Sequence, residues 1–279
     1  MKRKRYQAAM VRIVAGVVTV IFGLPLYLAL VNVFKSEEQI TQYPVALPDP
    51  FTLENLHRVI TRPDNLLFEG LKTSFIITIA TVVIVVFFAS TLGYYIARHE
   101  RSRYLQALLL IFIAGMMVPT QVTIVPVARL LTWFGLMGTL QGMILFQAGG
   151  GLLSFAVFVY SGFVKTIPKE LDESAMIDGA SRFTLFWRII FPLMRPATAT
   201  VAIFLTLWTW NEFLIPLIIL GPGKGITITT GIFTAVDNLN INYGGAFALM
   251  FLSALPLLAF FFVLQKEFIA GLTGGSLKG

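Results

Sequence analysis

The sequence contains no cysteine and few charged residues. Asp, Glu, Lys and Arg together make up only 13% of its 279 residues, whereas 57% are hydrophobic and the mean hydropathy is +0.81. The absence of cysteine excludes disulfide bonds, thiolate metal ligands and thiol nucleophiles. So few charges cannot cover the apolar area of such a chain, which excludes a water-soluble globular domain. We therefore expect a protein that is solvated by lipid.

Motifs that would indicate catalysis or ligand binding are also lacking. His57 and His99 lie in separate predicted loops, and neither has a second histidine or an acid at metal-ligand spacing. The glycine-rich segment 221–225 resembles a phosphate loop only superficially, because Ile218 and Gly225 stand where that loop needs glycine and Ser or Thr. No Ser-His-Asp group can be assembled on one membrane face. We predict no catalytic residue, no metal site and no cofactor bound by this chain.

Six apolar stretches are long enough to cross a membrane, since about 20 helical residues span the roughly 30 Å hydrocarbon core. The predicted spans are residues 13–34, 75–97, 104–128, 139–164, 197–220 and 246–264. The first has 22 residues, more than the roughly 7–15 of a signal-peptide core, so we expect it to be retained. The fold class predicted is an all-α membrane protein with six transmembrane helices.

The distribution of basic residues predicts which side of the membrane each loop occupies. An even number of spans returns both termini to one side. That side carries 15 Lys and Arg, including those of segments 98–103 and 165–195, and the other side carries 6. The positive-inside rule then makes residues 1–12 a cytoplasmic N-terminus and residues 265–279 a cytoplasmic tail. The net charge of +7 is thus a topology signal, and we expect no nucleic-acid partner.

The polar segment 165–195, between the fourth and fifth predicted spans, begins with a short helix. Pro168 suits the first helical turn, and three acids there favour the positive end of the helix dipole: Glu170, Asp172 and Glu173. Gly179 is typical of a helix end. Leu171, Ala175 and Gly179 recur every four residues, which predicts a stripe where another backbone can approach closely.

A second helix is expected after this turn. Its predicted apolar face consists of Phe183, Phe186, Trp187, Ile190 and Phe191, and Pro192 is expected to end it. Two interpretations of the hairpin are open on this pattern. It is either a docking platform for a partner protein or an amphipathic element in the lipid headgroup region.

The order of residues in this segment resembles the EAA signature of ABC importer permeases. The matching residues are Glu173, Ser174, Ala175, Gly179, Ile189, Ile190, Phe191 and Pro192. Ser174 and Phe191 stand where the family more often has alanine and leucine. The resemblance implies a cytoplasmic coupling helix that sits in a cleft of an ATPase. It implies a coupling role for Glu173, Ser174, Ala175, Asp178, Gly179, Phe186 and Pro192.

Glu212 is the one charged residue within a predicted span. An ionisable group in a span usually faces the bundle interior or a water-filled cavity, which makes it a functional candidate. The alternative is an interfacial group, because Glu212 lies only eight residues before the end of its span. We predict a substrate pathway that includes Trp210, Asn211 and Glu212, which combine convergent polar groups with a ring face.

A second resemblance extends over nearly the whole chain. Residues 210–213 with Pro216, residues 93–98 and 117–119, and the tail are similar to maltose-type carbohydrate importers. This likeness implies a prokaryotic inner-membrane permease that works with a second homologous permease, an extracytoplasmic binding protein and two ABC ATPases. The ATPases would bind ATP and magnesium. The rival hypothesis is a stand-alone secondary transporter or channel, which the single intramembrane acid and the lack of a convincing repeat disfavour.

The tail is the last functional element that the resemblance suggests. Residues 268 and 269 are expected to continue the sixth helix to a stop at Gly271. In the related permeases such a tail enters the interface between the two ATPases. This implies a contact role for Gly271, Thr273, Gly274 and Gly275, and the alternative is an untethered end of the chain.

Overall fold

The computed structural model describes the backbone of residues 2–221, 225–237 and 242–274. Every regular element in these ranges is a helix. The elements are α1 (Lys2–Asn32), α2 (Glu37–Gln42), α3 (Glu54–Ile60), α4 (Leu66–Arg98), α5 (Arg103–Met117), α6 (Thr120–Trp133), α7 (Leu140–Gly149), α8 (Gly151–Val164), α9 (Glu170–Ile177), α10 (Arg182–Thr184), the π-helix η1 (Leu185–Ile190), α11 (Phe191–Leu193), α12 (Arg195–Asn211), α13 (Leu214–Ile219), α14 (Ile228–Asp237) and α15 (Tyr243–Gly274). The predicted all-α class is confirmed.

Three helical stretches are long and apolar enough to cross a membrane by themselves: Met10–Asn32, Leu66–Arg98 and Tyr243–Val263. Three further spans are possible if each of three bent helix pairs crosses as one unit, which gives up to six. The predicted count of six is therefore compatible with the structure, but the third bent pair consists of Arg182–Leu193 and Arg195–Asn211 and does not coincide with the predicted span 197–220. The side on which the termini lie remains a prediction.

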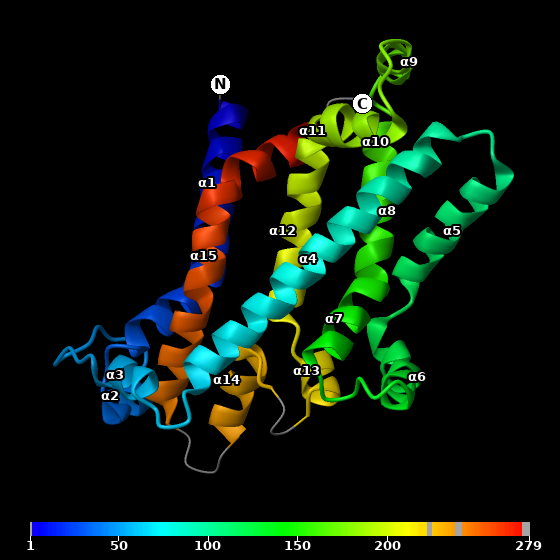
Figure 1. Cartoon of the computed structure of the whole chain (residues 1–279). Coiled ribbons are helices and arrows are strands. Elements are labelled where there is room, and N and C mark those ends of the chain that lie inside the picture. Colours follow the sequence, from blue (N-terminus) through cyan, green and yellow to red (C-terminus); the bar gives the residue numbers. More distant parts are fainter. Residues whose placement is uncertain (1, 222–224, 238–241, 275–279) are drawn as a thin grey trace. The chain divides into compact units, whose positions relative to one another are not determined.

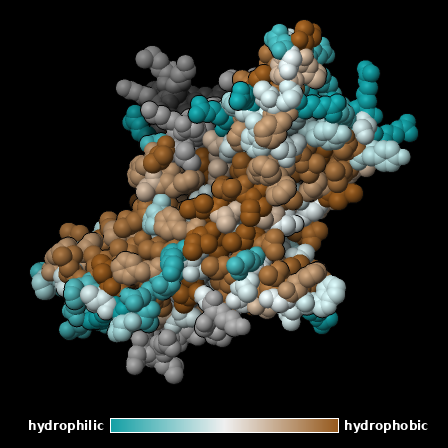
Figure 2. Space-filling model, viewed as in Figure 1, coloured by the Kyte–Doolittle hydropathy of each residue, from teal (hydrophilic) through white to brown (hydrophobic). Residues whose placement is uncertain are grey.

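The chain divides into two compact units. Unit 1 comprises Met1–Phe68 and Gly231–Pro256, and unit 2 comprises Glu69–Thr230 and Leu257–Gly279. In unit 2, α5 packs along α8, and α8 packs along α12 (Figure 1). On the visible face of this unit, hydrophobic side chains cover the middle of the helices, and hydrophilic ones gather toward the helix ends (Figure 2). Large exposed side chains such as Leu110 and Ile111 suit contact with lipid tails.

Unit 1 is held together by capped helix ends. The buried ammonium of Lys35 donates to the side chain of Asn32 and to the carbonyls of Tyr43 and Pro44, at 2.9–3.0 Å. It satisfies two carbonyls where the chain leaves α2. The carboxylate of Glu37 accepts from the N–H groups of residues 243 and 244, which caps the start of α15.

Two of the predicted spans are sharply bent. α5 and α6 meet at 103°, so residues 104–128 do not form one straight helix. Pro119 explains this correction, because it disfavours helical geometry at Val118, whose ψ is 117°. α7 and α8 meet at 43° around Gly150, so residues 139–164 do not form one straight helix either.

The predicted span 197–220 is also interrupted. α12 ends at Asn211, Glu212 is extended with ψ 129°, and α13 starts at Leu214. The carboxylate of Glu212 competes with the helix by bonding the N–H groups that follow it. All three breaks lie in unit 2, and they determine where its cavity forms.

Candidate functional site

The short cytoplasmic helix predicted in segment 165–195 is α9. It begins at Glu170, two residues after Pro168. Gly179 follows its end with φ +85°, a conformation that glycine adopts without strain. Gly179 N–H donates to the Met176 carbonyl at 3.1 Å, and Ala180 N–H donates to the Ala175 carbonyl at 3.0 Å. This pair of bonds is a Schellman motif, and the predicted helix end at Gly179 is confirmed.

The exposed face of α9 differs from the predicted stripe. Ala175 is buried in the core of unit 2, whereas Gly179 has no heavy atom within 4 Å of a Cβ built on it. Leu171, Ala175 and Gly179 therefore do not form one open surface. The side chains that α9 exposes include two large apolar ones, Met176 and Ile177, together with Glu173, Ser174 and Asp178.

A buried ion pair fastens α9 to the end of α4. Asp172, which is 7% exposed, accepts from Arg98 Nε at 2.8 Å and Nη2 at 2.7 Å, in a bidentate arrangement. Tyr94 Oη donates to the same carboxylate at 2.7 Å. Arg98 Nη1 donates to the carbonyl of Ile167 at 2.9 Å, in the turn before α9. We call Tyr94, Arg98 and Asp172 the latch.

Sequence reasoning did not find the latch. It assigned Asp172 to the helix dipole and counted Arg98 only as a topology charge. One local signal was present in the sequence: Asp172 shares a helix face with the small residues Ala175 and Gly179, at i, i+3 and i+7. In the structure, Asp172 and Ala175 on that face are buried. The partner of Asp172 lies 74 residues away along the chain.

The second half of the segment is one continuous helical run with a π-helical centre. α10, η1 and α11 cover residues 182–193, so the run ends at Leu193, one residue after the predicted stop at Pro192, and meets α12 at 73°. Phe191 N–H donates to the Phe186 carbonyl, five residues back. Pro192 has no N–H to continue this spacing, so the chain returns to α-helical geometry for the last residues of the run.

The apolar face of this run packs against α4. Phe186 and Ile190 are buried, and Phe183, which was expected on the same face, is 74% exposed. The Phe186 ring lies 5.3 Å from the Tyr94 ring, measured between centroids. Trp187 stacks on the Phe87 ring of α4 at 5.5 Å. The run continues into α12 through one turn residue, so the hairpin contacts α4 and is covalently joined to α12.

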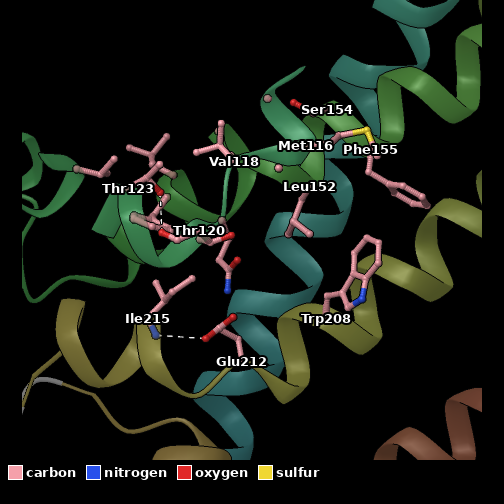
Figure 3. A pocket seen from close by; sticks show the side chains of 18 residues that line it. Met116, Val118, Thr120, Thr123, Leu152, Ser154, Phe155, Trp208, Glu212 and Ile215 are labelled. Carbon is pink, nitrogen blue, oxygen red and sulfur yellow. Dashed lines mark hydrogen bonds between the residues drawn. The ribbon is translucent and has the colours of Figure 1, made fainter. Parts of the chain in front are cut away.

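A cavity of about 670 Å³ lies where the three helix breaks of unit 2 meet (Figure 3). Its lining includes residues from every break. They are Gly115, Met116, Val118 and Thr120 at the α5–α6 bend, Gly149, Gly150 and Gly151 at the α7–α8 bend, and Glu212 and Ile215 at the α12–α13 break. Broken helices at membrane depth are tolerated where they line a cavity, and this cavity is a candidate for the translocation path.

Glu212 caps α13 from inside this lining. Its Oε1 accepts from the N–H groups of Phe213, Leu214 and Ile215 at 3.0–3.3 Å. A carboxylate at a helix N-terminus is stabilised by the dipole. Figure 3 shows the bond to Ile215 and the side chain of Glu212 beside the cavity. The cavity-facing interpretation of Glu212 is thus the one that the geometry supports.

The other two predicted pathway residues lie elsewhere. Trp210 is buried, and its ring makes an edge contact with Phe75 at 5.0 Å. Asn211 is exposed and donates to the Leu207 carbonyl at 2.8 Å. Neither lines the cavity, but Trp208 does. Its i, i+4 spacing to Glu212 was the signal that could have identified it.

The predicted helix end in the tail is wrong. α15 continues through Gly271 and Thr273 to Gly274. Glycine lowers helix propensity but does not by itself end a helix. Gly275 lies outside the described residues, and the contact role of the tail remains a prediction.

Comparison with known proteins identifies the family. The family described as "Binding-protein-dependent transport system inner membrane component" matches residues 89–272. The probable starch degradation products transport system permease protein AmyC of Thermoanaerobacterium thermosulfurigenes is 29% identical over 100% of both chains. The multiple sugar-binding transport system permease protein MsmG of Streptococcus mutans is 31% identical over 91% of both chains. The melibiose/raffinose/stachyose import permease protein MelC of Bacillus subtilis is 30% identical over 96% of both.

The fold also matches a solved structure, that of a bacterial ABC transporter involved in the import of the acidic polysaccharide alginate. The TM-score is 0.84 at 18% identity, and the match covers 95% of this chain and 98% of the other. The family match extends over most of unit 2, including the latch and the cavity. This chain belongs to the family of binding-protein-dependent transport system inner membrane components.

Proposed function

We propose that this chain is a permease subunit of an ATP-driven ABC importer in the inner membrane of a prokaryote. Its substrate is a sugar or oligosaccharide delivered by an extracytoplasmic binding protein. The observation that carries the proposal is the connection of the hairpin of residues 165–195 to α12, whose residues line the cavity. The names of the relatives, which include permeases for starch degradation products and for raffinose, support the substrate class.

The exposed face of α9 is the proposed contact with an ATPase. Met176 and Ile177 offer apolar area there, and Glu173, Ser174 and Asp178 offer polar groups around it. An ATPase cleft that encloses α9 would bury both kinds of group. The partners are two ABC ATPases, which bind ATP and magnesium, and a second homologous permease that completes the membrane path.

Movement of α9 would then be passed to two helices, α4 and α12, and only α12 contributes residues to the cavity lining. The latch transmits it to α4, because a buried bidentate ion pair resists separation. The π-helical run transmits it to α12, which ends at Glu212 in the cavity lining. Closure of the ATPases would thus move two helices as rigid bodies and change access to the cavity.

The rival function, a stand-alone secondary transporter, gains no support from the broken helices. Transporters of that class often have interrupted spans. This chain also has them, although its family is defined by dependence on a binding protein, so interrupted spans do not distinguish the two functions. The hairpin of residues 165–195 has no evident role in such a transporter. An ATPase partner gives it one.

Reconstitution tests the proposal. The complete complex is placed in proteoliposomes, with purified binding protein outside and ATP and Mg²⁺ inside. Uptake of radiolabelled maltotriose and raffinose is measured, and a matched sample contains a non-hydrolysable ATP analogue. We expect uptake of at least one sugar that requires both hydrolysable ATP and binding protein. Uptake driven by an ion gradient without ATP would contradict the proposal.

A further inference from the structure

We propose that this chain itself binds the substrate, and that the cavity at the three helix breaks is a subsite for one ring of a neutral sugar. Gln147 and Glu212 supply the hydrogen-bonding groups, and Trp208 supplies the ring platform. Figure 3 shows Glu212 and Trp208 in the lining. The inference rests on the proposed function, but it adds a ligand site within this subunit and a charge preference.

The first observation is an unpaired amide. Gln147 is only 6% exposed, it lines the cavity, and its Nε2 has no hydrogen-bond partner among the described residues. A buried polar atom without a partner destabilises a fold, so native structures retain few of them. Four other buried side-chain atoms are also unpaired in the described part of the chain, but none belongs to a residue of the lining. A ligand hydroxyl in the cavity is the partner that this amide lacks.

The second observation is the unequal use of the Glu212 carboxylate. Oε1 takes all three hydrogen bonds from the start of α13. Oε2 takes part in none of these three bonds and can accept from a ligand. A donor on Gln147 and an acceptor on Glu212 together suit neighbouring hydroxyl groups, each of which both donates and accepts. The hydroxyls of Thr120, Thr123 and Ser154 add further polar groups to the lining.

The third observation is an aromatic platform. Trp208 lines the cavity, and its side chain is accessible, with an exposed fraction of 45%. Its ring is held by Phe155 and Phe204, at centroid distances of 4.9 and 5.4 Å. A fixed indole presents an electron-rich apolar face, and the C–H face of a sugar ring packs against such a surface. The cavity volume of about 670 Å³ falls within the roughly 300–1,000 Å³ typical of small-molecule sites.

The charges in the lining favour a neutral ligand. Glu212 is its one acid, and the residues that line the cavity include no Lys or Arg. Proteins usually hold a sugar carboxylate with the fork of an arginine. Here an acidic sugar would instead meet the carboxylate of Glu212 in a medium of low dielectric constant, where like charges repel strongly. We therefore assign the site to uncharged rings and not to uronic acids.

Uptake by variants of the reconstituted complex tests the site. With maltotriose and raffinose as probes, Gln147→Leu and Trp208→Leu should each lower kcat/KM for uptake by about tenfold, the effect of one lost hydrogen bond or ring contact. The matched control is Thr209→Val, which also removes a buried unpaired polar atom but lies outside the lining. It should leave uptake unchanged.

A stability measurement separates binding from folding. Gln147→Leu removes an unpaired buried amide, so the melting temperature of the complex should stay the same or rise while uptake falls. If Gln147 instead had a structural role, Gln147→Leu would lower both the melting temperature and the uptake. Variants at residues 147 and 208 that transport as well as Thr209→Val would overturn the subsite. Failure of the unmodified complex to import either sugar would count against the proposed function instead.

Direct binding tests the charge preference without the binding protein. Calorimetry on the solubilised complex compares maltotriose with digalacturonate. We expect maltotriose to bind to the unmodified complex and digalacturonate to bind at least tenfold more weakly. Glu212→Gln should reduce the difference in affinity between the two sugars, because it removes the charge that repels digalacturonate and keeps an acceptor oxygen. Equal affinity of the unmodified complex for the two sugars would overturn the assignment to neutral rings.

Discussion

The latch and the cavity are two polar clusters of unit 2 that differ in how fully their groups are paired. In the latch, both oxygens of Asp172 accept hydrogen bonds, and Arg98 donates through three nitrogens. In the cavity, Gln147 Nε2 has no partner among the described residues. A fully paired buried cluster keeps one geometry. A partly paired cluster in a cavity is open to a ligand.

This difference assigns different roles to the two clusters. Breaking the latch should reduce stability and coupling together, because it leaves a buried charge without its partner. Changing the cavity should reduce transport and leave stability almost intact. The latch would therefore hold α9 in place, and the cavity would contact the transported molecule.

The largest effect is expected from Asp172→Ala. Removing one partner of a buried ion pair lowers the free energy of unfolding by about 3–5 kcal/mol, and stimulation of ATP hydrolysis by loaded binding protein should be lost. The exposed pair of Lys169 and Glu100 is the matched control. It joins the same two regions at 3.4 Å with side chains that are 54% and 44% exposed.

Lys169→Ala should change stability by about 1 kcal/mol or less. Melting temperature and stimulated ATPase activity of the assembled complex are the measurements. The double variant Arg98→Leu with Asp172→Leu should recover most of the stability lost in Asp172→Ala, because no buried charge then remains unpaired. Equal effects of Asp172→Ala and Lys169→Ala would show that the latch has no special role.

The features that the sequence predicted well depend on neighbouring residues. Apolar runs predicted the helices, and Gly179 predicted the end of α9, because span length and helix capping are local properties. The latch joins residues 74 positions apart, and no local pattern contains that pairing. The cavity requires three helix breaks to meet. Pro119 and Gly150 lie at two of them, but the predicted spans 104–128 and 139–164 ran through both positions, and only the packing of the helices brings the breaks together.

A smaller effect is expected at Gly179. Its φ of +85° costs about 1–2 kcal/mol for most side chains, whereas asparagine tolerates this region. Gly179→Leu should therefore lower coupled uptake through distortion of the end of α9, and Gly179→Asn should retain it. Uptake by both variants is compared with ATPase binding in pull-downs. Equal loss in both would show that added bulk at a partner surface matters more than backbone conformation.

Glu212→Gln should affect stability less than either change above. The amide oxygen can still accept from the start of α13, so loss of the charge should cost about 0.3–1 kcal/mol, with near-normal expression. Uptake or substrate range should change because Glu212 lines the cavity. Asn211→Ala provides the comparison. If only Glu212→Gln alters uptake, the pathway follows the cavity. If Asn211→Ala has the same effect, the pathway also includes Asn211, the exposed neighbour that the sequence predicted.

The smallest effect on assembly is expected from removal of residues 271–279. The deletion shortens α15 by its last turn and leaves α9, the latch and the cavity unchanged, so the complex should assemble through α9. If the tail contacts the ATPases, its loss should change how loaded binding protein stimulates ATP hydrolysis and should reduce uptake, with an unchanged melting temperature. This pattern differs from that of Asp172→Ala, in which stability and stimulation fall together. A truncated complex that hydrolyses ATP and transports like the full-length one would show that communication runs through the hairpin alone.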